Sequence, residues 1–176
     1  SGDLGGAYMG LQVLERERLV YQDNPEMQPE LEGADYILER QLKPEARKDV
    51  IHYLKDLGVK PTSMIDISDG LASEALHLCK NGDLGCVLFD EKLPVDQETY
   101  NTAREFNLDA STAALNGGED YELLFSISQA DYEKIKDSEH LTIVGHYTDK
   151  GSGCNIVDRG GTSIPISAQG WNHFEE

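Results

Sequence analysis

At 176 residues, with 39% hydrophobic and 27% charged residues, the chain has the size and composition of one globular domain that can bury its own core. Its 33 acidic residues outnumber 15 Lys and Arg, which gives a net charge of −18. Such a charge repels nucleic acid and anionic membrane surfaces, so neither is expected as a partner. A phosphate-bearing ligand would need divalent cations, or a more basic partner, to approach this chain.

Cysteine usage and hydropathy indicate the compartment. The three cysteines, Cys79, Cys86 and Cys154, include no C-x-x-C pair, and the first two lie in apolar segments where free cysteine packs as a small hydrophobe. This usage is typical of a reducing compartment. The sequence has no signal peptide and no apolar run approaching the roughly 18 residues of a membrane span. We therefore expect a soluble, cytoplasmic protein.

The first third of the chain predicts helices. Glycines in the first ten residues indicate that another segment packs closely against the first helix. A polar stretch with two prolines is expected to form a loop, and Gly58 is expected to end the last of these helices. The predicted helices are Gly5–Arg18, Leu31–Gln41 and Arg47–Leu57, and the loop is Gln22–Glu32.

The stretch Ser63–Cys79 organises the rest of the chain. A short apolar run is expected to form a buried strand, which brings Asp66, Ser68 and Asp69 to a turn at Gly70. An amphipathic segment with helical period follows at once. Ser and Asp are the commonest residues that cap a helix start, so the junction can be structural. Three oxygen-bearing side chains in four positions are also what a metal or phosphate site offers, and both interpretations stay open.

The remaining elements mix strands and helices without regular alternation. We therefore expect an α+β fold with a mixed, partly antiparallel sheet flanked by helices, in one domain over residues 1–176. The expected strands are Cys86–Phe89, Tyr121–Ile127 and Leu141–Val144, with a hairpin of Asn155–Asp158 and Thr162–Ile166 around Gly160-Gly161, and the expected helices are Leu71–Lys80, Pro94–Phe106 and Gln129–Lys136.

A second acidic motif, N-G-G-E-D at 116–120, precedes the strand at Tyr121–Ile127. Its two glycines allow a ligand to approach the backbone, although a tight turn alone also explains them. Neither this motif nor the first contains Lys or Arg, so a phosphate would have to be held through Mg²⁺, which prefers oxygen ligands. The single tryptophan, Trp171, either packs on the sheet or forms an aromatic wall for a flat, cationic ring.

Several common enzyme motifs are absent. The chain has no P-loop, no strand-coupled G-x-G-x-x-G and no nucleophile elbow, so neither a Walker nucleotide site, a Rossmann site nor a catalytic nucleophile is predicted.

Three motifs in order, M-I-D-I-S-D-G-L, N-G-G-E-D-Y-E-L-L-F and G-W-N-H-F, resemble the C-terminal half of thiamine-monophosphate kinase. This family belongs to the superfamily of aminoimidazole ribonucleotide synthetase, selenophosphate synthetase and HypE. The resemblance implies ATP-dependent phosphorylation of thiamine monophosphate to thiamine diphosphate by direct transfer. It also implies that Asp66 and Asp69 hold Mg²⁺, Ser68 contacts ATP, Glu119 contacts thiamine monophosphate, and Trp171 stacks beside its rings. Positioning and charge neutralisation are most of what such chemistry requires.

The family's N-terminal, ATP-binding half is absent from this chain. We therefore expect the chain to be a C-terminal domain that is inactive alone, and a homodimer when full length. Two other functions stay open. One is an enzyme of the same superfamily with another acceptor, and the other is a non-catalytic acidic domain that only binds a ligand or partner.

Overall fold

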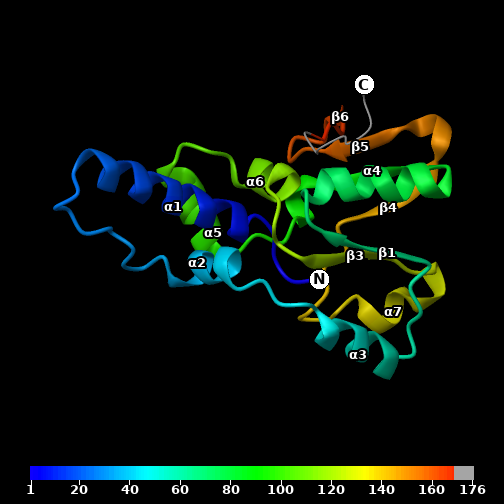
Figure 1. Cartoon of the computed structure of the whole chain (residues 1–176). Helices are drawn as coiled ribbons and strands as arrows, with labels where there is room; N and C mark the ends of the chain where they lie inside the picture. The colour runs from blue at the N-terminus through cyan, green and yellow to red at the C-terminus, as the bar shows by residue number, and fades with distance from the viewer. Residues whose placement is uncertain (169–176) are drawn as a thin grey trace.

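The computed structural model describes residues 1–168 and has the expected α+β class, with helices around mixed strands (Figure 1). Three short 3₁₀ helices lie at Asp90–Lys92, Gln129–Asp131 and Lys150–Ser152. The α-helices are α1 (Gly6–Asp23), α2 (Asp35–Leu42), α3 (Lys48–Asp56), α4 (Leu71–Gly82), α5 (Gln97–Glu105), α6 (Ala110–Asn116) and α7 (Tyr132–Ile135). The strands are β1 (Ser63–Ile67), β2 (Leu84–Phe89), β3 (Glu122–Ser126), β4 (Gly145–Asp149), β5 (Cys154–Val157) and β6 (Ser163–Pro165).

The strands form two sheets in the described residues, where one mixed sheet was expected. β1 pairs with β3 in an antiparallel ladder. The other four strands follow the order β4-β2-β5-β6, in which β2 and β5 are parallel and the remaining pairs are antiparallel. The two sheets are separate because α4 lies between them and contacts β1 and β3 on one side and β2 on the other (Figure 1).

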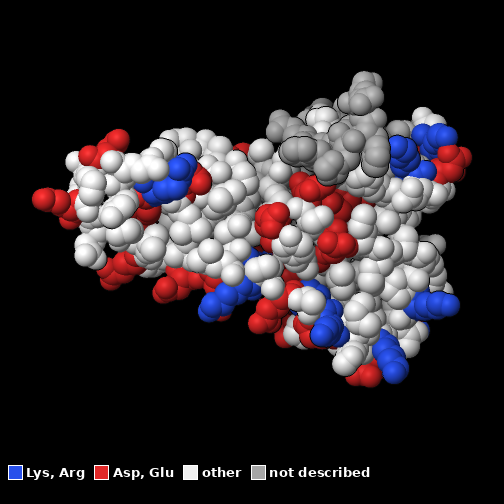
Figure 2. All heavy atoms as spheres, in the orientation of Figure 1, with Lys and Arg blue, Asp and Glu red and all other residues white. Residues whose placement is uncertain are grey.

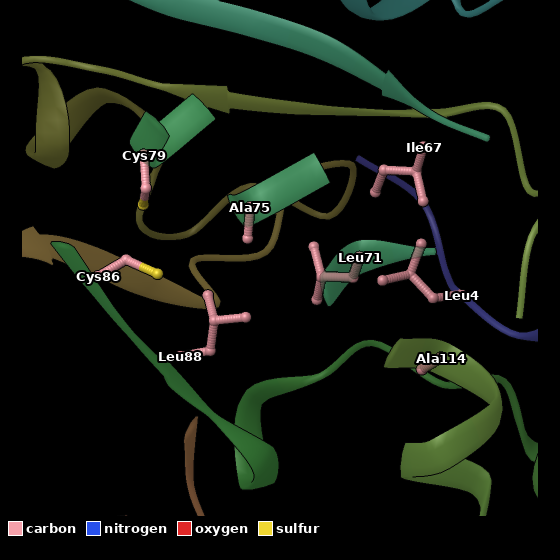
Figure 3. Packing of buried hydrophobic residues seen from close by; sticks show 8 residues of the cluster. All are labelled: Leu4, Ile67, Leu71, Ala75, Cys79, Cys86, Leu88 and Ala114. Atoms are coloured by element: carbon pink, nitrogen blue, oxygen red, sulfur yellow. The ribbon is translucent and has the colours of Figure 1, made fainter. Parts of the chain in front are cut away.

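Helix α4 carries the central core. Its apolar residues Leu71, Ala75 and Cys79 pack with Ile67 of β1 and with the buried residues of β2 (Figure 3). The helical period predicted this face correctly. Burying a side chain such as Leu71 stabilises the fold by about 2 kcal/mol. The core therefore fixes the end of β1, and with it the turn that follows, against both sheets.

The N-terminal glycines permit close packing, as expected. Helices α1 and α2 lie side by side, together with α5, at one end of the molecule (Figure 1). A Cβ atom at Gly10 would come within 3.0 Å of the backbone of Ile37 in α2. Helix α1 therefore tolerates only glycine where it meets α2.

The second half of the chain differs from the prediction in three features. The strand expected at Leu141–Val144 lies at β4 instead, and Leu141 is buried in a core cluster with Val50 and Leu54 of α3. Helix α6 was not predicted. The hairpin of β5 and β6 is confirmed, but its loop, 158–162, is longer than the expected two-residue turn.

An apolar cavity of about 590 Å³ lies beside α4, lined by residues of α4, β2, β3 and the segment leading into β4. It does not include the acidic residues singled out in the sequence.

In the part of the chain that the structure describes, no helix combines the length and the apolar character that crossing a membrane requires.

Candidate functional site

Strand β1 ends at the first acidic motif. Successive side chains of a strand point to opposite faces, so Ile67 enters the core, where it is 2% exposed, while Asp66 faces solvent. The strand is half-buried along most of its length, not buried as the sequence suggested, because only one of its faces lies against α4. The alternation places the Asp66 carboxylate on the solvent-exposed side of the strand.

The turn between β1 and α4 depends on Gly70. Its φ of +116° is rarely adopted by other residues, and a Cβ atom there would lie 2.7 Å from the carbonyl oxygen of Leu115. Gly70 occupies the N-cap position of α4, and no side chain caps this helix. The capping interpretation of Ser68 and Asp69 is therefore wrong, and the exposed Asp69 carboxylate remains available to a ligand.

The second acidic motif lies directly beside the first. The amide of Glu119 donates a hydrogen bond of 2.8 Å to the carbonyl oxygen of Ser68, and the amide of Tyr121 donates one of 2.8 Å to that of Ile67. Both donors have positive φ, 72° for Glu119 and 51° for Tyr121, a conformation uncommon outside glycine. A Cβ atom at Gly118 would come within 3.0 Å of the Ser68 carbonyl oxygen. Both motifs thus pack backbone against backbone.

Tyr121 and Glu119 contact each other through their side chains at this junction. Tyr121 donates a hydrogen bond of 3.0 Å from its Oη to Oε2 of Glu119. This bond and the Glu119 charge raise the pKa of Tyr121, and the charges of Asp66 and Asp69 raise it further. Figure 2 shows acidic side chains gathered over the region where β1, β3, α4 and α6 meet in Figure 1.

The donor set fits a hard divalent cation. Asp66, Asp69 and Glu119 are exposed, and none of them forms an ion pair within residues 1–168. Unpaired carboxylates close together repel one another, and a bound cation relieves this repulsion. Carboxylate oxygen is also the ligand that Mg²⁺ prefers in proteins. These side chains therefore offer the kind of ligand that Mg²⁺ prefers, although in residues 1–168 the three carboxylates do not form a group whose ligand atoms all lie within 4.8 Å of one another.

Two neighbouring acidic residues, Asp120 of the second motif and Glu122 of β3, face inward. Asp120 accepts hydrogen bonds from the amides of Gly5 (2.7 Å) and Ala7 (3.2 Å) at the start of α1. Burial raises its pKa to about 6, although these hydrogen bonds and the charge of Arg40 oppose the rise. Glu122, 1% exposed, pairs with Arg40 at 3.0 Å and also with Arg47. These two carboxylates hold the fold together, and only Glu119 points outward.

Glu74 supports the first motif and was not singled out from the sequence. It is 2% exposed, and its Oε1 accepts a hydrogen bond of 3.1 Å from the amide of Asp69. Its Oε2 is buried without a hydrogen-bond partner in residues 1–168, and burial raises the pKa of the carboxyl. The helical period alone would leave Glu74 exposed, but it does not show that α6 packs against the start of α4.

The structure thus brings four of the five predicted site residues together. Asp66, Ser68, Asp69 and Glu119 lie at one junction, with Ser68 half-buried between the two loops. Trp171 lies outside the described residues.

Relatives of the chain are found along nearly its whole length. No protein-family model matches it. It is 30% identical over 174 residues to the thiamine-monophosphate kinase of Aquifex aeolicus, and 29% identical over 182 residues to that of Escherichia coli K12. These alignments cover 99% of this chain, but 50% and 51% of the two kinases.

By sequence and by fold, the chain is similar to the thiamine-monophosphate kinases. The structure "AaThiL complexed with AMPPCP and TMP" matches 99% of this chain and 50% of its own, with a TM-score of 0.74 and 28% identity. Escherichia coli HypE, at 16% identity and a TM-score of 0.65, shares the fold. The chain spans about half the length of the curated kinases that it matches, and the resemblance found in its motifs is confirmed.

Proposed function

We propose that the chain is the C-terminal half of an ATP-dependent thiamine-monophosphate kinase, and that it contributes metal ligands and substrate contacts to the active site. The observation that carries this proposal is the junction of the two acidic motifs, where Asp66, Asp69 and Glu119 are exposed around Tyr121. The similarity to kinases twice as long supports it, as does the neighbour solved with AMPPCP and TMP.

Each residue has a role in this proposal. Asp66 and Asp69 hold Mg²⁺, and Ser68 contacts ATP. Bound Mg²⁺ would neutralise the negative charge of the phosphates. Glu119 binds thiamine monophosphate, with Trp171 beside its rings, because a carboxylate and an indole face both attract the positive charge of a thiazolium.

The chemistry of phosphoryl transfer agrees with what the junction offers. Direct in-line transfer requires that donor and acceptor are positioned and that charge is neutralised, and it needs no protein nucleophile. The backbone hydrogen bond between Glu119 and Ser68 keeps the residue that bears the acceptor-binding carboxylate next to the metal-binding turn. The chain's own contribution is therefore positioning.

The nucleotide-binding contacts of the proposed kinase come mainly from a second, N-terminal domain. We expect the isolated chain to have no kinase activity, and the full-length protein to be a homodimer. Light scattering on the complete protein measures the second expectation directly.

A chimera tests the function. This chain replaces the matching half of the Aquifex aeolicus kinase, and thiamine diphosphate is measured with ATP, Mg²⁺ and thiamine monophosphate. The proposal predicts product from the chimera and none from the chain alone. Clear turnover by the isolated chain contradicts the half-enzyme proposal.

Other acceptors separate the remaining alternatives. A folded chimera that binds nucleotide but phosphorylates a different acceptor indicates another enzyme of the superfamily. One that binds neither ligand, as judged by calorimetry, indicates a binding domain without catalysis.

A further inference from the structure

Three sulfur atoms meet in the core, away from the acidic junction. Cys79 lies on α4, Cys86 on β2 and Cys154 on β5, and their Sγ atoms all lie within 4.8 Å of one another. Figure 3 shows the side chains of Cys79 and Cys86 directed into the space between α4 and β2. These are the only cysteines of the chain, and three different elements bring them to one point.

The topology fixes this meeting. Cys86 and Cys154 are partners in the parallel pairing of β2 and β5, so their side chains lie on the same face of the sheet. Helix α4 packs on that face and places Cys79 above them. Each cysteine is thus held by backbone pairing or helix packing, and no loop needs to move to bring the sulfurs together.

The spacing is close to that of a metal–sulfur site. With metal–sulfur bonds of about 2.3 Å, three ligands around one ion lie about 3.8 to 4.0 Å apart. A small rotation about the cysteine side chains suffices to reach this spacing from distances within 4.8 Å. Sulfur ligands select soft ions such as Cu⁺ and Zn²⁺ over Mg²⁺.

The surroundings exclude a nucleophilic role for these thiols in the absence of a metal ion, whereas a coordinating metal ion deprotonates a thiol outright. Cys79 and Cys86 are 2% and 3% exposed within an apolar cluster, and burial raises the pKa of Cys79 to about 11 and that of Cys86 further. A reactive cysteine needs a depressed pKa. A metal ion can nevertheless reach these thiols, because Cys86 lines the apolar cavity beside α4 and Cys154 is half-buried.

We propose that Cys79, Cys86 and Cys154 form a binding site for one soft, thiophilic metal ion, Cu⁺ or Zn²⁺, separate from the carboxylate junction. Each thiol that becomes a ligand gives its proton to solvent, and no electron is transferred. In the described residues the group contains no fourth Cys, His, Asp or Glu. Cu⁺ is therefore bound by three sulfurs, and Zn²⁺ by three sulfurs and a water molecule.

Metal retention tests the site. The reduced 176-residue chain is incubated without oxygen with either Zn²⁺ or Cu⁺, excess ion is removed by gel filtration, and retained metal is counted by mass spectrometry. We expect one ion per chain in at least one arm, with X-ray absorption showing sulfur neighbours at about 2.3 Å. Cys79→Ser, Cys86→Ser and Cys154→Ser should each reduce retention at least tenfold.

A matched control separates this site from the carboxylates. The double variant Asp66→Asn/Asp69→Asn should retain the soft metal as the unmodified chain does. If Cys79→Ser or Cys86→Ser misfolds, the test relies on Cys154→Ser, because Cys154 is only half-buried. The bound ion should raise the melting temperature of the unmodified chain but not that of Cys154→Ser. Retention of neither ion, or equal retention by the Cys154→Ser variant, overturns the proposal.

Discussion

The amide of Glu119 donates a hydrogen bond of 2.8 Å to the carbonyl oxygen of Ser68, which joins the two acidic motifs. The residues are about fifty positions apart in the sequence, and the antiparallel pairing of β1 with β3 brings them together. A contact between two backbones is insensitive to side-chain rotation. It therefore fixes the spacing between the turn that bears Asp69 and the backbone of Glu119.

Removing one metal-binding carboxylate should impair the kinase chimera. Asp69→Asn keeps the size of the side chain but removes the charge that binds Mg²⁺, and we expect kcat to fall about 100-fold or more. Asp83→Asn is the matched control. Asp83 is exposed, pairs with Lys150, and has a φ of 55°, which asparagine tolerates. Equal losses of rate in the two variants would remove Asp69 from the site.

The close approach of the two loops should be intolerant of a methyl group. Gly118→Ala puts a Cβ atom against the Ser68 carbonyl oxygen, and we expect a loss of about 1–3 kcal/mol in the free energy of unfolding. Gly151→Ala is the control, since no atom lies within 4 Å of a Cβ there. Urea denaturation of both variants measures the difference, and equal stabilities contradict the packing described for Gly118.

Asp120 should make stability depend on pH. Its pKa is about 6 in the folded chain and 3.8 in the reference state, so the folded state binds the proton more tightly. Stability from this group is present below pH 4 and is lost as the pH rises to about 6. The loss amounts to about 3 kcal/mol.

The measurement is the difference in unfolding free energy between the unmodified chain and Asp120→Asn. This difference should fall between pH 4 and 6, whereas Asp137→Asn, at an exposed position, should give a flat difference. A flat difference for Asp120→Asn as well would show that this carboxyl ionises normally.

The buried ion pairs of Glu122 should contribute strongly to stability. Arg40→Ala leaves Glu122, 1% exposed, with Arg47 as its only remaining cationic partner within residues 1–168, and we expect a loss of about 3 kcal/mol. Lys43→Ala, which removes an exposed pair with Glu39, should cost less than about 0.5 kcal/mol. Thermal or urea unfolding compares the two, and similar small effects would contradict a structural role for Arg40.

Much of the junction could be predicted from sequence because its signals are local. The apolar run before Asp66, the glycine at the turn and the helical period after it define β1 and α4 without tertiary information. The side chains that face inward could not be predicted in this way. Glu119 and Asp120 are adjacent and chemically alike, and only the contact of Asp120 with the start of α1 distinguishes them.

Tertiary packing explains the errors. Glu74 occupies a polar helix position by periodicity, but it is buried in the structure. The apolar run at Leu141–Val144 satisfies a strand pattern, yet Leu141 is buried in the cluster around α3 and the ladder begins at Gly145. The separation of the strands into two sheets depends on where α4 packs, and a sequence pattern does not record that.

The most direct test replaces Mg²⁺ with paramagnetic Mn²⁺ on the isotope-labelled chain, in the presence of AMPPCP, and follows the broadening of backbone amide NMR signals. The carboxylate site predicts selective broadening at residues 66–70 and 118–121, and its loss in Asp66→Asn/Asp69→Asn. Broadening centred on other acidic surfaces, or unchanged in the double variant, would contradict the assignment of these carboxylates as the metal site.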